Sequence, residues 1–125
     1  MPQRNLGPNF RNANIQPGQH LGALSQTVTL LADNTPVLLN SMTQMLRLGS
    51  DNATAANRTF TLTNGYIDGQ LLFLHFVTGG STSAELADTG NVKLSAAWTP
   101  VIDGTLTLQW DDLDSVWRET ARSAN

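Results

Sequence analysis

The sequence predicts an all-β protein, and three observations support this fold class. Apolar and polar residues alternate over short segments, turn dipeptides such as Asn64-Gly65, Asp68-Gly69 and Asp103-Gly104 separate these segments, and there is almost no helical pattern. Alternation places successive side chains on opposite faces of a strand, and such dipeptides favour tight turns. We therefore expect a single antiparallel β-sandwich or barrel-like domain.

The expected strands follow one another from residue 26 onward. Residues 26–31 alternate β-branched and polar side chains, and the turn-forming residues 33–36 follow them. Residues 42–48 are compatible with a strand or with one helical turn, because Met42, Met45 and Leu46 also fit a 3.6-residue period. The other expected strands cover residues 37–39, 60–63, 70–77, 86–94, 105–110 and 116–119.

Two of these strands indicate which side chains are buried. Residues 105–110 place apolar side chains on one face and Thr or Gln on the other, which is typical of a half-buried strand. Residues 70–77 are apolar on both faces, so this strand is either central in the domain or covered by a second subunit. Burial at an interface would contribute about 1.5–3 kcal/mol for each large side chain. One face holds Leu72, Leu74 and Phe76, and the other holds Leu71, Phe73 and Val77 together with His75.

Residues 1–25 are set apart from the β-domain of residues 26–125 by their Pro and Gly content, which disfavours regular structure. Two interpretations are open: a disordered terminus, or an extended arm that docks on a neighbouring subunit and becomes ordered on assembly. The arm interpretation rests on three spaced apolar residues and two basic ones. These are Leu6, Phe10, Ile15, Arg4 and Arg11.

Composition and charge narrow the classes of function. The chain has 125 residues, of which 14% are charged, whereas an average soluble domain has about 25%. A net charge of −3 and a pI near 5.0 argue against nucleic acid as a partner, because a phosphate-backbone binder needs a basic face. The chain has no Cys, so it has neither a disulfide framework nor a thiolate metal site. No signal peptide or membrane-spanning segment is expected.

The ionisable residues give little indication of catalysis, and we assign no catalytic, cofactor or metal-binding residue. Of the two histidines, His20 and His75, the second is interpreted as a hydrogen-bonded histidine of the core or an interface. The residues Asp111–Asp114 lack the Gly and terminal Glu of a calcium loop and are expected to form a solvated hairpin tip. A glycan hydrolase would need a carboxylate pair, for which Asp88 with Asp103 or Asp111 are the available residues.

The tryptophans allow a structural and a binding interpretation. Trp110 and Trp117 are expected to pair across a hairpin, which is the favoured interpretation. The other interpretation is a sugar-binding platform that uses these residues with Trp98, but alternation places Trp110 on the apolar face of its strand.

Three blocks of the sequence resemble structural proteins of tailed bacteriophages. They are residues 61–70, residues 86–94, and residues 105–111 followed by 117–119 and 122–125. In order and spacing they are similar to strand-rich modules of phage head fibres, tail fibres and small capsid-decoration proteins, over about half of the chain from Phe60 to Asn125. Residues 112–115 depart from this pattern, because such modules usually close the final hairpin with a tight Asp-Gly or Asn-Gly turn.

The resemblance implies a jelly-roll or β-tulip-like domain that acts as a capsid decoration, or cement, protein. Such a protein is made in the host cytoplasm and binds the outer surface of the virion capsid as a homotrimer. Its partners are the major capsid protein and further copies of itself, and it stabilises the shell against the pressure of packaged DNA.

Within this role, the resemblance implies two sets of contact residues. Arm residues Arg4, Leu6, Phe10, Arg11 and Ile15 would contact the capsid, and Leu72, Phe73, Leu74 and Phe76 would form the subunit interface. The alternative function is a short head-fibre, tail-fibre or adhesin module whose Trp-rich end binds host-surface glycans. The decoration role is favoured because the chain has no heptads and no shaft.

Overall fold

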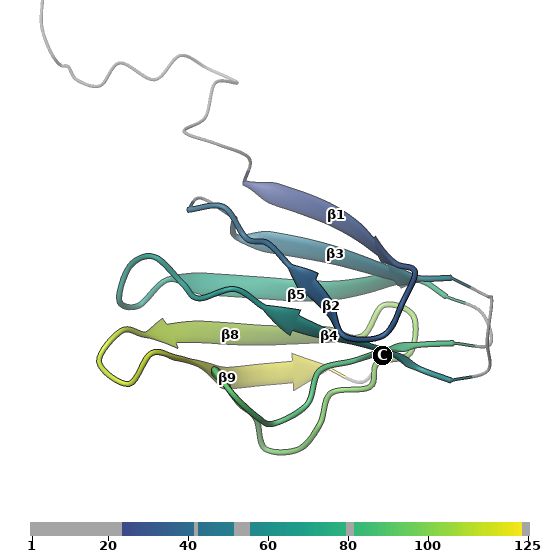
Figure 1. The fold of residues 1–125 in the computed structure, drawn as a ribbon. Coiled ribbons are helices and arrows are strands. Elements are labelled where there is room, and N and C mark those ends of the chain that lie inside the picture. Colours follow the sequence, from purple (N-terminus) through teal and green to yellow (C-terminus); the bar gives the residue numbers. More distant parts are fainter. Residues whose placement is uncertain (1–23, 42, 52–55, 80–81, 124–125) are drawn as a thin grey trace, which may run out of the picture.

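The computed structural model describes residues 24–41, 43–51, 56–79 and 82–123. Within these ranges the chain forms strands and no helix, which confirms the all-β class (Figure 1). It follows that no helix in these ranges is long and apolar enough to cross a membrane. The strands are β1 (Ser25–Leu30), β2 (Thr35–Val37), β3 (Met45–Ser50), β4 (Arg58–Leu62), β5 (Leu71–Thr78), β6 (Ala84–Glu85), β7 (Val92–Lys93), β8 (Thr105–Asp111) and β9 (Val116–Ser123).

The strands form two sheets that share one core. The larger sheet has six strands in the order β1-β3-β5-β8-β9-β7, and the smaller has three in the order β2-β4-β6. In Figure 1 the strands β2 and β4 are drawn in front of the larger sheet. Buried side chains from both sheets belong to a single hydrophobic cluster, which includes Phe60 of β4, Leu74 of β5 and Leu106 of β8. The two sheets therefore contribute side chains to one shared core.

The expectation of an antiparallel fold is wrong, because most neighbouring strands run parallel. The pairs β1–β3, β3–β5, β7–β9, β2–β4 and β4–β6 are parallel, and only β5–β8 and β8–β9 are antiparallel. A jelly roll is an antiparallel architecture, so that expectation fails as well.

The order in which the chain visits the two sheets explains the parallel pairing. From β1 to β6, consecutive strands alternate between the larger and the smaller sheet. When the chain returns to a sheet after passing through the other one, the new strand runs in the same direction as the previous strand of that sheet. Parallel neighbouring strands require a crossover connection of this kind. Asn64-Gly65 and Asp68-Gly69 lie in the connection from β4 to β5, where they join strands of different sheets rather than a hairpin.

Several segments differ from the expected strands. Strand β2 covers Thr35–Val37 instead of residues 37–39, so part of the expected turn at 33–36 is a strand, and β6 at Ala84–Glu85 was not expected. The ambiguous segment 42–48 contributes to strand β3, which extends from Met45 to Ser50. Residues 86–94 form a single bridge to Trp98 and the short strand β7 instead of one continuous strand. The carboxylate of Asp88 accepts a hydrogen bond from the N–H of Leu94 at 2.8 Å, and Gly90 has a φ of +62°, so the chain turns within this segment.

The faces of the strands are buried as the alternation predicts. On β8, Leu106, Leu108 and Trp110 are 0–2% exposed, whereas the alternate residues are half-buried or exposed. On β5, three alternate side chains are in the core and the others face outward. At about 1.5–3 kcal/mol for each buried apolar side chain, this shared core is the main stabilising contribution to the fold.

Candidate functional site

The outer face of the six-stranded sheet carries large apolar side chains that remain exposed. On β5, Leu71 is 43% exposed and Phe73 is 44% exposed. The register places Phe73 between Met45 of β3 and Thr107 of β8, which are both half-buried. We refer to Met45, Leu71, Phe73 and Thr107 as the outer sheet face. Its centre is apolar and its neighbours are mostly uncharged, which makes it suited to contact with another protein surface.

A groove continues the outer sheet face at the end where β5 begins. It has a volume of about 390 Å³ and lies between residues 41–44 and residues 67–71. Its apolar lining comes from Leu71 and from Ile67, which is 69% exposed. The apolar surface therefore extends from the middle of β5 into the loop before it.

His75 lies on the same side of β5 as Phe73 and is paired with a turn residue. Its Nε2 atom lies 3.1 Å from Oδ1 of Asp103, and the register places Arg47 of β3 beside it. Asp103 has a φ of +69°, and its N–H donates to the carbonyl of Phe76 at 2.8 Å. The contact with Asp103 confirms that His75 is hydrogen-bonded, but its side chain is 31% exposed and does not lie in the core, so a place in an interface stays a prediction. These contacts give the outer face a polar border.

The predicted subunit-interface residues do not lie on one surface. Leu72 and Leu74 are 0% exposed and Phe76 is 2% exposed, so all three belong to the core of this chain and are not available to a second subunit. Only Phe73 of the predicted set faces outward. Sequence reasoning had placed Leu71 on the same face as Phe73 but did not include it in the interface, although the alternation was the signal that could have identified it.

The predicted arm contacts lie outside the described residues, as does His20. Arg4, Leu6, Phe10, Arg11 and Ile15 all fall within residues 1–23. The first described residue, Leu24, accepts hydrogen bonds at its carbonyl from the N–H groups of Gln44 and Met45, at 2.8 and 3.1 Å. The chain therefore enters the β-domain next to Met45 of the outer sheet face.

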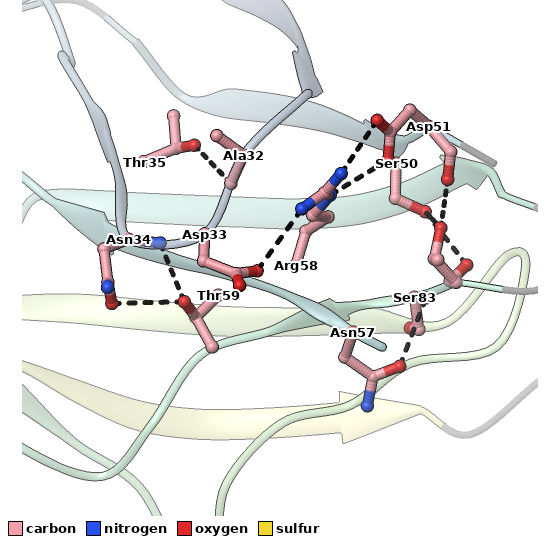
Figure 2. A network of polar contacts seen from close by, with 11 residues as sticks. Ala32, Asp33, Asn34, Thr35, Ser50, Asp51, Asn57, Arg58, Thr59 and Ser83 are labelled. Atoms are coloured by element: carbon pink, nitrogen blue, oxygen red, sulfur yellow. Dashed lines mark hydrogen bonds and ion pairs between the residues drawn. The ribbon is translucent and has the colours of Figure 1, made fainter. Parts of the chain in front are cut away.

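A polar network connects the β1–β2 turn with β3 and β4 (Figure 2). Arg58 donates from Nε and Nη2 to the two carboxylate oxygens of Asp51, at 3.0 and 3.1 Å, and its Nη1 lies 3.7 Å from Asp33. The hydrogen bond to Asp51 is the main cause that raises the pKa of Arg58. Beside it, Oγ1 of Thr59 accepts from the N–H of Asn34 at 2.8 Å. These contacts hold a crossover between the two sheets, so we interpret the network as structural.

The three tryptophans belong to the core. Trp98 and Trp110 are 2% exposed and Trp117 is 0% exposed. Trp110 and Trp117 lie opposite each other on β8 and β9, with ring centroids 5.2 Å apart and an interplanar angle of 61°, which confirms the predicted pair. The indole N–H of Trp117 donates to the carbonyl of Thr63 at 3.0 Å. A sugar platform needs open ring faces, and these indoles do not provide them.

The acidic tip of the β8–β9 hairpin is organised by its own hydrogen bonds. Oδ1 of Asp111 accepts from the N–H groups of Leu113 and Asp114, at 3.0 and 3.3 Å. Arg118 binds Asp111 at 2.9 Å and Asp114 at 2.6 Å, and its hydrogen bond lowers the pKa of Asp111. Within the described ranges, no group of three or more His, Cys, Asp or Glu side chains is placed to hold a metal ion.

The carboxylates considered for a glycan hydrolase each have a separate local contact. Asp88 accepts from the N–H of Leu94, Asp103 pairs with His75, and Asp111 pairs with Arg118. No known protein-family model matches this chain, and no curated protein sequence matches it either.

Proposed function

We propose that this chain is a structural protein of a bacteriophage virion, which decorates the outer surface of the capsid and stabilises it. The observation that carries this proposal is the outer sheet face, on which Leu71 and Phe73 are 43% and 44% exposed. Large apolar side chains on a sheet with few charges gain free energy when another protein covers them. The resemblance of residues 60–125 to phage decoration modules supports the same function.

The proposed assembly is a homotrimer in which the two facing sheets of each copy form a β-sandwich. Phe73 and Leu71 would lie in the contact between subunits, with Met45 beside them. The proposed location is the outer capsid surface, and the proposed partner is the major capsid protein.

The proposed capsid-binding arm is shortened from residues 1–25 to residues 1–23, because Leu24 bonds to the β-domain and β1 begins at Ser25. Its proposed contacts come from Arg4, Leu6, Phe10, Arg11 and Ile15. Because the carbonyl of Leu24 is bonded to Gln44 and Met45, the arm would leave the domain beside the outer sheet face. Weak arm contacts from the copies of a trimer would then act together, which raises the apparent affinity without any new contact.

Co-sedimentation with capsids that lack the protein tests this function. The truncated chain should begin at residue 24, because Leu24 bonds to the β-domain and β1 begins at Ser25. We expect the full chain to sediment with capsids, and the truncated chain to stay folded but remain in the supernatant. Absence of binding by the full chain would overturn the proposal.

The outer sheet face is tested by a pair of Lys substitutions. Phe73→Lys should reduce the trimer mass measured by light scattering toward that of a monomer, because a charge on this face opposes its burial. Leu113→Lys is the matched control, since Leu113 is 91% exposed at the hairpin tip. If both variants retain the wild-type mass, Phe73 does not lie in the subunit contact.

A further inference from the structure

Within the described residues, the two sheets have four outer edges, and three of them carry features that prevent further strand pairing. Strand β2 has three residues and contains Pro36, and β6 has only two residues. Strand β7 also has two residues, one of them the exposed Lys93. Beyond β7, Ser95 and Arg122 hold the following loop against β9, through hydrogen bonds to Glu119 at 2.8 Å and to the carbonyl of Ala96 at 2.8 Å.

The fourth edge, β1, has none of these features. Strand β1 lies at the edge of the larger sheet (Figure 1). Its six residues, from Ser25 to Leu30, include no Pro, no Gly and no charged side chain. Strands of Thr and Val with free edges pair readily with another strand, and proteins normally block such edges. Among the described edges, β1 is therefore the one whose residues are best suited to pair with a further strand.

The hydrogen bonds to β3 identify the peptide groups that face the open side. The carbonyl of Leu24 accepts from Met45, and that of Leu30 accepts from Asp51, both at 3.1 Å. Alternate residues of a strand direct their peptide groups to the same side, so the even-numbered residues bond to β3. Ser25, Thr27 and Thr29 therefore direct their N–H and C=O groups away from the sheet.

We propose that β1 pairs in antiparallel register with β1 of a second copy of this chain, across a two-fold axis at Thr27. In this register Thr27 faces the partner copy's Thr27, and Ser25 faces the partner copy's Thr29. All three residues then use their free peptide groups in hydrogen-bonded pairs. Cross-strand pairs of Thr with Thr or Ser are favourable, and the absence of charge in β1 excludes like-charge pairs between the two strands.

The neighbouring strands do not oppose this pairing. The nearest basic side chain in the row of Thr27 is Arg47 of β3. Across the two-fold axis the two Arg47 residues would be separated by three strand spacings, or about 14 Å, which exceeds the Debye length of about 8 Å at physiological salt. The pairing of two β1 strands uses the sheet edge and leaves the outer sheet face free. It therefore goes beyond the proposed function, because it would join two copies of the chain, or two of the proposed trimers.

Disulfide cross-linking of the full-length chain tests the register, because the wild-type chain has no Cys. In a hydrogen-bonded antiparallel pair the Cα atoms are about 5.5 Å apart, which a disulfide can span. Thr27→Cys should therefore give a covalent dimer under mild oxidation. Thr29→Cys lies on the same edge, but its two copies would be about 13 Å apart, too far for a disulfide. We expect at least ten-fold more dimer from Thr27→Cys than from Thr29→Cys on a non-reducing gel.

A mixture of Ser25→Cys and Thr29→Cys should also cross-link, because these positions face each other in the proposed register. Equal amounts of covalent dimer from Thr27→Cys and Thr29→Cys would overturn the proposal. The absence of dimer from Thr27→Cys would also overturn it, and this result would follow if residues 1–23 or another protein occupied the edge. All three positions are exposed or at the edge, and circular dichroism verifies that each variant is folded. The experiment uses the purified chain alone, so its outcome is independent of capsid binding.

Discussion

At the scale of single residues, Gly65 shows how closely the core is packed. A Cβ atom added at Gly65 would lie 2.6 Å from Cδ2 and 2.7 Å from Cβ of Trp110. Trp110 is itself confined by its edge-on contact with Trp117, so it has little room to move. We expect Gly65→Ala to lower the free energy of unfolding by about 1–3 kcal/mol, because overpacking displaces side chains or backbone. Urea denaturation followed by circular dichroism measures this loss.

The control for Gly65 is the same substitution in a Trp110→Ala background. Alanine lacks the ring atoms Cγ and Cδ2 that the added Cβ atom would meet, so the cost of Gly65→Ala should decrease in this background. A double-mutant cycle isolates this coupling because the two residues are in contact. Equal costs in both backgrounds would show that the steric explanation is incorrect.

The lowered pKa of Glu119 predicts how the free energy of unfolding depends on pH. The hydrogen bond from Arg122 is the main cause that lowers the pKa of this carboxyl group from 4.5 to about 2, and Ser95 adds to the effect. Because the folded-state pKa is lowered, the carboxylate contributes stability above pH 4.5, and this contribution is lost as the pH falls toward 2. The side chain of Arg122 is 31% exposed, so solvent screening reduces the contribution, and we expect about 1–2 kcal/mol.

Glu119→Gln tests this pH dependence. The variant should be less stable than the wild type at pH 7, and the difference between them should decrease as the pH falls from 4.5 to 2. Chemical denaturation at several pH values gives both free energies of unfolding. A difference that does not change with pH would exclude an ionic contribution from Glu119.

At the scale of elements, neighbouring residues of β5 point in opposite directions, one into the core and the next toward the outer sheet face. Leu74 is 0% exposed and Phe73 is 44% exposed. We expect Leu74→Ala to cost about 2–5 kcal/mol in unfolding free energy, because it leaves a cavity in the core. Phe73→Ala should cost less than half as much at concentrations where the chain is monomeric. Thermal and urea unfolding of the two variants provide the comparison, and similar losses would mean that Phe73 is covered in the monomer.

The positions of the longer strands could be predicted from the sequence, but the bounds of β2, the short strand β6 and the pairing of the strands could not. Alternation is a local property, so it identified β8 and the two faces of β5. The direction of neighbouring strands depends on which sheet the chain enters after each turn, and Asp68-Gly69 is compatible with both a hairpin and a crossover. The parallel pairs β1–β3 and β3–β5 therefore had no local signal.

The candidate site was predictable only in part for a similar reason. Leu72, Leu74 and Phe76 form one apolar face of their strand, and Leu71, Phe73 and Val77 contribute to the other. Packing against the smaller sheet decides which face is buried, and that packing joins residues distant in sequence. Sequence reasoning thus included one exposed apolar residue of β5, Phe73, in the predicted interface, but it also included three residues that lie in the core.

At the scale of the whole molecule, the two sheets should unfold together. Their buried side chains form one cluster, and this cluster contains Trp98, Trp110 and Trp117. Neither sheet can lose its packing partner without exposing the apolar face of the other, so a partly unfolded state with one intact sheet has a high free energy. We expect the unfolding transitions from Trp fluorescence and from far-ultraviolet circular dichroism to coincide in urea.

The chain that begins at residue 24 should have the same midpoint, because the described core lies entirely within it. Separate transitions for the two probes would mean that the parallel strands β1 to β6 form a unit that unfolds independently of the β8–β9 hairpin.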